Sequence, residues 1–255
     1  MDEYFRAVEL RLTIDEFHRL PRNAAYKYEY FDGRAVLSPR PKMFTCVRDL
    51  AAVEYPGDPP AVGLRPLSAT DIAGLVDLFR SATANTQPFA SLDAAGRTQV
   101  SVACLERTFT GKDGPVIEPA CLTAHDHDSG TLVGAVLVTL VPPAVLTDPF
   151  AGEWREPPPA DAVERKLGVP HLTWVLVDGL RHRRGVGTAL LCGAVYALRG
   201  NGFDTLASTF LLDNGPSLLW HWRNGFRLLP QWSVAMRRAS VRREQAGDRH
   251  GEAGQ

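Results

Sequence analysis

The spacing of apolar and polar residues changes along the chain, and it predicts an α/β protein. Helical spacing is clear in residues 72–79, where apolar side chains stand three and four positions apart behind a cap at Ser68 or Thr70. A short, almost wholly apolar run such as His171–Val177 is typical of a strand covered on both faces. The patterns predict helices at 72–79, about 92–109, 185–199 and 216–224, and strands at 62–67, 116–124, 131–141, 171–177, 205–212 and 226–236. Helices placed between strands in this way predict a central, covered sheet.

The first 60 residues have a different texture. Residues 13–20 are typical of a short helix, with Thr13 at its cap and Glu16 at the capping-box position. Residues 26–37 are typical of two strands joined by an Asp-Gly turn. Prolines between residues 39 and 60 then indicate a linker or irregular surface segment. We therefore expect a helix-and-hairpin extension over 1–60, one domain over 62–238 and a disordered tail over 239–255.

A polar insertion over about 143–169 interrupts the expected domain. It contains three consecutive prolines, and an insertion of this length is usually functional or disordered. Its carboxylates would favour a cationic amine if they faced a binding cleft, and would otherwise only solvate a surface loop. They are Asp148, Glu153, Glu156, Asp161 and Glu164.

Composition narrows the classes of function. Among 255 residues, Lys and Arg number 28 and Asp and Glu 29, so the net charge of -1 gives no global basic field for nucleic acid. The four cysteines form no CxxC pair, which excludes a dense disulfide framework and a cysteine-based zinc ribbon. The acidic N-terminus is unlike a signal peptide, and the longest apolar run, 132–146, is too short to cross a bilayer. These features predict a soluble cytoplasmic protein with reduced thiols and without a membrane or nucleic-acid partner.

The segment Val177–Leu191 is the most informative part of the chain. It runs from the end of a buried strand through a turn with two glycines into a helix that begins near Gly185. Glycine lets the backbone approach a ligand, and the first helical turn presents unpaired N–H groups with partial positive charge. The segment therefore predicts a phosphate or pyrophosphate site, to which positive charge is added by Arg181, Arg183 and Arg184. The alternative is a glycine turn packed tightly on a strand.

Two common nucleotide-binding loops do not fit this segment. A Walker A loop needs a lysine after the glycines, and none is present. A Rossmann loop needs a glycine where this chain has Leu190.

Two blocks resemble the GNAT superfamily of acyl-CoA-dependent N-acyltransferases. The first resembles the family's motif A, in which Val177, Gly185, Val186, Gly187 and Ala189-Leu190-Leu191 match. Gly179 stands where proline is common, and His182 stands where arginine or glutamine is usual. The second block resembles motif B, with Asn214, Gly225 and Phe226 at the correct spacing.

This resemblance covers about 62–238 and implies a GNAT-type fold: a mixed central sheet with helices on both faces, whose fourth and fifth strands splay apart. It implies that acetyl-CoA is the cosubstrate, that the turn holds its pyrophosphate and that its pantetheine pairs with strand backbone. No metal is implied. The implied binding residues are Leu176, Val177, His182, Arg183, Arg184, Gly185, Val186, Gly187, Thr188 and Asn214.

Two histidines are candidate catalytic residues by the same resemblance. His221 stands where many members carry a tyrosine that protonates the leaving thiolate, and a histidine can donate a proton near neutral pH. The alternative is a packing histidine between Trp220 and Trp222. His171 begins its strand where arylalkylamine-type members have a histidine base, although the second histidine of that pair is Thr173 here. The alternative for His171 is an ordinary residue at a strand end.

Three other patterns carry weaker indications. Residues 125–128 (His-Asp-His-Asp) could bind metal, but turn chemistry in a hairpin loop explains them better. Glu164-Arg-Lys166 resembles a nuclease triplet but lies in the polar insertion. Residues 13–41 resemble the opening segment of a predicted restriction-type endonuclease family, without its metal-binding core.

The sequence thus predicts an N-acetyltransferase that moves an acetyl group directly from acetyl-CoA to an amine of a small molecule or protein. The alternative is a non-catalytic acyl-CoA-binding regulatory module, because His182 and His221 depart from the family pattern. A DNA-related role, suggested by the N-terminal resemblance and the arginines, conflicts with the near-zero net charge. The acceptor amine is not specified, and a homodimer is left open.

Overall fold

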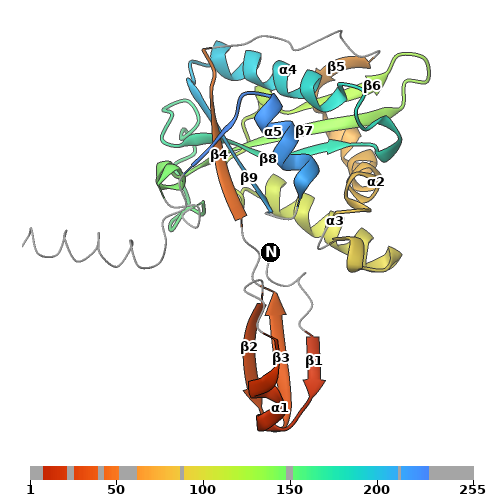
Figure 1. The fold of residues 1–255 in the computed structure, drawn as a ribbon. Coiled ribbons are helices and arrows are strands. Elements are labelled where there is room, and N and C mark those ends of the chain that lie inside the picture. The colour runs from red at the N-terminus through yellow and green to blue at the C-terminus, as the bar shows by residue number, and fades with distance from the viewer. Residues whose placement is uncertain are drawn as a thin grey trace, which may run out of the picture.

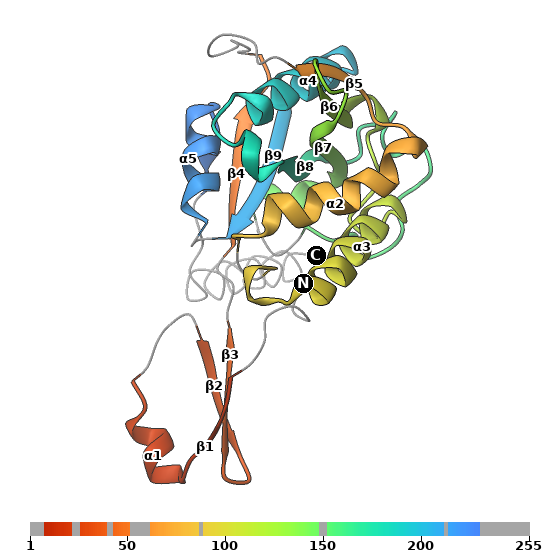
Figure 2. The ribbon, with the colours of Figure 1, turned by 90° about the vertical axis from the view of Figure 1, so that its right-hand side faces the viewer.

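A computed structural model describes residues 8–21, 26–39, 43–51, 62–86, 89–147, 152–211 and 214–229. These residues form a three-stranded sheet and a seven-stranded sheet with helices on both faces (Figures 1 and 2). In the larger sheet β8 and β9 are parallel, and the other neighbouring pairs are antiparallel. The prediction of a mixed central sheet with helices on both faces is confirmed.

The smaller sheet contains the predicted N-terminal helix and hairpin. Its strands β1 (Val8–Arg11), β3 (Arg34–Pro39) and β2 (Tyr26–Phe31) pair antiparallel in that order. Helix α1 (Ile14–Arg19) has the expected capping box, in which the Thr13 N–H donates to Glu16 Oε2 at 2.8 Å. The buried Phe17 ring lies 5.2 Å from the Tyr30 ring, measured between centroids, and so attaches α1 to the sheet.

The larger sheet has the strand order β10-β4-β9-β8-β7-β6-β5. The strand bounds are β4 Met43–Asp49, β5 Val62–Pro66, β6 Leu122–Asp126, β7 Leu132–Val141, β8 Val169–Val177, β9 Thr205–Leu211 and β10 Arg227–Leu228. The prediction of an irregular segment between the prolines was wrong for residues 43–49, because β4 pairs with β9 along its whole length. Prolines flank this stretch without interrupting it, so its N–H groups are free for the ladder.

Two pairs of helices cover the two faces of this sheet. Helices α2 (Ile72–Thr83) and α3 (Ala94–Phe109) pack on one face through side chains that include Leu75, Phe79 and Cys104. Helices α4 (Val186–Gly200) and α5 (Gly215–Arg223) lie on the other face (Figure 2). Ser68 does not cap α2 itself; it caps the 3-10 turn η2 (Ala69–Asp71) that leads into it.

Three further segments differ from the sequence prediction. The expected strand 116–124 begins only at Leu122, because residues 118–120 form the 3-10 turn η4 (Glu118–Ala120), where Pro119 has no N–H for a ladder. Val116 makes only an isolated bridge to Thr139. The expected strand 226–236 is seen as the two residues of β10, and positions from 230 onward, with the predicted tail, lie outside the described residues.

The described part of the polar insertion packs against β7. The Trp154 indole donates to the Leu140 carbonyl at 2.9 Å, and Val145 and Ala162 are buried. Gly168 lies so close to the Val141 carbonyl that no side chain would fit there. The segment begins with the 3-10 turn η5 (Pro143–Leu146). Its buried residues therefore add to the core at one end of the sheet.

Among the described residues, no helix has the length and apolar character that crossing a bilayer requires. The division of the chain at about residue 60 stays a prediction. Strand β4, from the N-terminal side of that boundary, nevertheless belongs to the larger sheet.

Candidate functional site

The parallel strands β8 and β9 separate partway along their length. Their pairing is confined to His171 opposite Ala207 and Leu172 opposite Ser208. Strand β8 nevertheless continues to Val177, paired with β7 on its other side. The register with β7 shifts around Thr173, which is an extra residue on β8 and marks a β-bulge. This bulge in the β7–β8 ladder directly follows the last residue of β8 that pairs with β9, and bulges redirect side chains and are common beside active sites.

The turn after β8 leads directly into the N-terminus of α4, whose cap residue Gly185 is exposed and whose first two residues are buried. Asp178 caps the 3-10 turn η6 (Gly179–Arg181) by accepting from the Leu180 N–H at 2.8 Å. Arg183 (φ 62°) and Gly185 (φ 79°) both adopt the left-handed conformation, which is unusual for arginine. Helix α4 starts at Val186, so its first-turn N–H groups lie beside this turn.

Only two of the three predicted phosphate-binding arginines remain available at the turn. Arg181 forms an ion pair with Asp126 at 2.6 Å and joins the β6–β7 hairpin to the turn after β8. Hydrogen bonds from Ser129, and then the charge of Arg181, hold the pKa of Asp126 below its usual range. Arg183 and Arg184 are exposed, and neither has an ion-pair partner in the part of the chain that the structure describes.

A cavity of about 630 Å³ lies where the strand ends, the turn and two helices meet. It is lined by Ser81, Ala82, Asn85, Thr86, Asp178, Gly179, Leu180, His182, Asn214 and Pro216. His182 and Asn214 were predicted for the cosubstrate. The residues from the end of α2 were not, because no motif in the sequence marks them. No described carboxylate of the insertion lines this cavity; Glu153 pairs with Arg107, and Asp161 pairs with Arg165.

Several predicted binding residues have structural partners. His182 Nε2 donates to the Val177 carbonyl at 3.0 Å, and Asn214 caps α5 by accepting from the Ser217 N–H at 3.1 Å. Leu176 and Val186 are buried and face opposite sides of the sheet, Val177 is half-buried, and Thr188 is half-buried in the first turn of α4.

Gly187 lies between β8 and α5. A Cβ atom added there would lie 3.4 Å from both Trp220 Nε1 and Val177 Cγ2. This close fit supports tight packing as the local reason for the glycine, which was the alternative to ligand approach.

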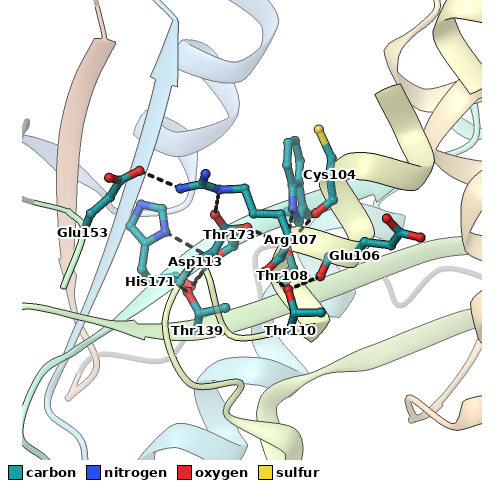
Figure 3. Close-up of polar contacts among 11 residues, drawn as sticks. Cys104, Glu106, Arg107, Thr108, Thr110, Asp113, Thr139, Glu153, His171 and Thr173 are labelled. Atoms are coloured by element: carbon teal, nitrogen blue, oxygen red, sulfur yellow. Dashed lines mark hydrogen bonds and ion pairs between the residues drawn. The ribbon is translucent and has the colours of Figure 1, made fainter. Parts of the chain in front are cut away.

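The two candidate catalytic histidines both lie beside the short β8–β9 pairing. His171 is itself one of the paired residues, and its side chain belongs to a polar network that reaches α3 (Figure 3). His221 comes from α5 on the other face, and its Nε2 lies 2.8 Å from Ser208 Oγ, beside the other paired position. Burial, and to a lesser degree repulsion from His221, lowers the pKa of His171 to about 4.

The surroundings of His221 favour a packing role. The side chain is 6% exposed, and its Nδ1 donates to the Ser217 carbonyl at 2.7 Å, which leaves Nε2 to accept from Ser208. Its ring stacks on Phe210 at 4.9 Å between centroids and meets the edge of Phe226 at 5.0 Å. Burial lowers the pKa of His221 to about 4, so the ring is neutral at pH 7, and its one N–H is used in the bond to the Ser217 carbonyl.

The protein is expected to lose stability as the pH falls from about 6.5 to 4. Both histidines have a folded-state pKa of about 4 against the ordinary value of 6.5, so the unfolded chain binds more protons across this window. Their contribution is complete above pH 6.5, is lost as the pH falls and stops changing below about 4. Urea unfolding at pH 7.0, 5.5 and 4.5 should show a total decrease on the order of 5 kcal/mol for the two histidines. A free energy of unfolding that stayed flat across this range would contradict the assignment.

Comparisons with known proteins found similarity only among solved structures. No protein-family model matches the chain, and no curated protein matches it. A GCN5-related N-acetyltransferase from Sphaerobacter thermophilus is 17% identical, with 74% of this chain and 49% of that chain covered and a TM-score of 0.46. The glucosamine N-acetyltransferase region of a fungal multi-domain β-N-acetylglucosaminidase is 11% identical, with 80% and 20% covered and a TM-score of 0.44. An aminoglycoside 6'-N-acetyltransferase from Acinetobacter haemolyticus is 17% identical, with 68% and 95% covered and a TM-score of 0.40.

This chain therefore spans about half of the first of these proteins and a fifth of the second. All three TM-scores lie below 0.5.

Proposed function

We propose that this protein is a GNAT-type N-acetyltransferase that transfers an acetyl group from acetyl-CoA directly to an amine of a small molecule or protein. The observation that carries this proposal is the separation of β8 and β9 beyond Leu172 and Ser208, next to a glycine turn and the N-terminus of α4. The first block that resembles the family, 177–191, covers the end of β8, the turn and α4. The second block, 214–226, covers α5, whose cap residue Asn214 and first-turn residue Pro216 line the cavity beside the turn.

The turn has the features that a pyrophosphate requires. The first-turn N–H groups of α4 and the exposed side chains of Arg183 and Arg184 would bind its negative charge. The thioester arm would extend between β8 and β9 and pair with the edge of β8 as an added strand. His182 would border this arm, because it already donates to the Val177 carbonyl.

The reaction forms a C–N bond as the C–S bond of the thioester breaks. The attacking amine loses a proton, and the departing thiolate gains one. His171 is neutral at pH 7 and would accept this proton at Nε2, which requires the Thr209 hydroxyl to give up its 3.0 Å hydrogen bond to that atom. Because the pKa of His171 is lowered to about 4, we expect the low end of the roughly 10²–10⁴-fold that a general base contributes. Holding the two substrates at the end of the β8–β9 pairing would supply much of the remaining rate enhancement.

We propose direct transfer of the acetyl group from the thioester to the amine, because the candidate side-chain nucleophiles are buried. Burial raises the pKa of Cys46 to about 12 and the pKa values of Cys104 and Cys121 to about 11, so these thiols are not thiolate nucleophiles at neutral pH. The Ser208 hydroxyl donates to His221. Ser208 is only 3% exposed beneath α5, so we do not propose that it carries the acyl group.

The alternative, a non-catalytic acyl-CoA-binding module, is favoured by one observation. Both ring nitrogens of His221 have partners inside the protein, so this side chain holds no proton-donating group toward a leaving thiolate. Such a module would bind the cosubstrate and turn over no amine.

Acetyl-CoA at about 100 times its dissociation constant is expected to stabilise the protein by about 2.7 kcal/mol. For a chain of this size the gain corresponds to a rise in melting temperature of roughly 5–10 °C. NAD and ATP at the same concentration should give no comparable rise. If acetyl-CoA produces neither a thermal shift nor a calorimetric heat, the proposal fails. When it binds, a panel of amines followed by CoA release then separates the enzyme from the binding module.

A further inference from the structure

A continuous chain of hydrogen-bonding groups leads from His171 to the loop after α3 (Figure 3). His171 Nδ1 lies 3.4 Å from Thr173 Oγ1, which lies 2.7 Å from Thr139 Oγ1. Thr139 Oγ1 in turn donates to the Asp113 carbonyl at 2.8 Å. On the other side of the ring, His171 Nε2 lies 3.0 Å from Thr209 Oγ1.

The direction of every bond in this chain follows from the Asp113 carbonyl. A carbonyl oxygen can only accept, so the single hydroxyl proton of Thr139 points to Asp113. Thr139 must then accept from Thr173, whose proton is used in this 2.7 Å bond because its other acceptor, the His171 carbonyl, is farther away at 3.4 Å. Thr173 is left with lone pairs toward the imidazole, so the group facing it has to be an N–H.

This ordering selects one tautomer of His171. Nδ1 carries the proton, and Nε2 carries the lone pair, which accepts from the Thr209 hydroxyl. In the opposite tautomer, lone pairs of Nδ1 and Thr173 would face each other. Thr209 is the first residue of β9 beyond the parallel pairing, so the lone pair lies at the point where β8 and β9 separate.

We propose that Thr139 and Thr173 are positioning residues for the reaction of this site: their hydroxyls tie the Nδ1–H of His171 to the Asp113 carbonyl and so leave the lone pair on Nε2, next to the Thr209 hydroxyl where β8 and β9 separate. The inference rests on the proposed function for its catalytic meaning. The tautomer itself does not depend on that function. The bulge at Thr173 explains why this hydroxyl reaches Thr139 on the neighbouring strand.

The loop that supplies the carbonyl is held by charged groups. The Asp113 carboxylate accepts from Arg107 Nε at 2.5 Å and from Thr108 Oγ1 at 2.7 Å. Thr108 also accepts from the Trp174 indole of β8 at 3.0 Å. Arg107 contacts Glu153 of the insertion as well, at 2.6 Å. The end of α3 is thus fixed to β8 and to the insertion, so the acceptor at the end of the chain has little freedom to move.

The tautomer can be read without any activity by two-dimensional ¹H–¹⁵N NMR of the histidine side chains. The wild-type protein should show His171 with a protonated Nδ1 and an unprotonated Nε2, and a His171→Gln variant identifies its signals. Thr173→Val and Thr139→Val remove one hydroxyl each with little change of shape, so they should shift His171 toward the Nε2–H form. Thr173→Ser and Thr139→Ser should restore the wild-type pattern. A wild-type Nε2–H tautomer would overturn the proposal.

Thr45 provides a matched control for the loss of a threonine hydroxyl. It stands opposite Thr209 on β4, is 1% exposed, and its hydroxyl has no hydrogen-bond partner among the described residues. Thr45→Val should therefore leave the tautomer of His171 unchanged. Because it removes an unpaired buried polar group, it should not lower the melting temperature.

Kinetics test whether the tautomer matters for turnover. With an accepted amine, Thr173→Val and Thr139→Val should lower kcat by about 10²-fold, the low end of a general base's contribution, and leave KM for acetyl-CoA unchanged. The serine variants should recover most of this loss. Among the described residues, the ionisable groups close to this series of hydrogen bonds are His221, Cys104, Arg107, Asp113 and Glu153. The kcat–pH profiles of all variants are therefore compared with that of wild type. If the valine variants change the tautomer but not kcat, the positioning role is wrong. If the tautomer behaves as expected and no amine is acetylated, the proposed function fails and the structural assignment stands.

Discussion

Replacing Arg183 and Arg184 together by glutamate is expected to weaken acetyl-CoA binding by about 100-fold. Both side chains are exposed at the turn before α4, where no described ion pair holds them. The change turns two attractions for a pyrophosphate into two repulsions, and 100-fold corresponds to only about 2.7 kcal/mol. Isothermal titration calorimetry on wild type and variant measures the ratio directly.

The matched control for this charge reversal is Arg199→Glu. Arg199 is also exposed and lies in the last turn of the same helix, far along α4 from the turn. It should lower stability slightly through the helix dipole and leave acetyl-CoA affinity within about twofold. The loss in the double variant should also shrink at high salt, because exposed charges are screened. Unchanged affinity in Arg183→Glu/Arg184→Glu would place the pyrophosphate elsewhere.

His221→Ala is expected to lower the free energy of unfolding by about 3–4 kcal/mol. The substitution leaves a cavity between the rings of Phe210 and Phe226 and removes the acceptor of the buried Ser208 hydroxyl. Thermal and urea unfolding measure the loss. Trp222→Ala, one position along the same helix and 70% exposed in the wild type, should change stability by less than about 1 kcal/mol.

Turnover of the same His221→Ala preparation decides between packing and catalysis. The packing role predicts that kcat per folded molecule barely changes. A proton-donor role predicts a decrease of about 10²–10⁴-fold with acetyl-CoA affinity kept, and partial recovery in His221→Tyr. The hydrogen bonds to Ser217 and Ser208 favour the first outcome. A large loss of kcat in a stably folded variant would support a catalytic role for His221 and contradict the packing role.

Local sequence patterns determined most elements of the larger sheet and the location of the candidate site. The helical spacing near Ile72, the apolar run ending at Val177 and the glycine turn before Val186 each predicted an element within a few residues of its bounds. These signals are readable because they depend on neighbours along the chain: periodicity, capping residues and glycine conformations. The capping box at Thr13 and Glu16 belongs to the same class.

Tertiary structure alone decided which distant residues meet. Nothing local shows that Met43–Asp49 pairs with β9, because a strand's partner depends on the packing of the whole sheet. The end of α2 and the turn after β8 line the same cavity. They are about 100 residues apart in the sequence, and no local pattern shows that they meet. The sequence left His171 as either a candidate base or an ordinary residue at a strand end, and the orientation of its ring depends on the bulge at Thr173 and on the Asp113 carbonyl. The chemistry of these side chains is set by hydrogen-bond partners and burial, and both arise only when separate elements pack together.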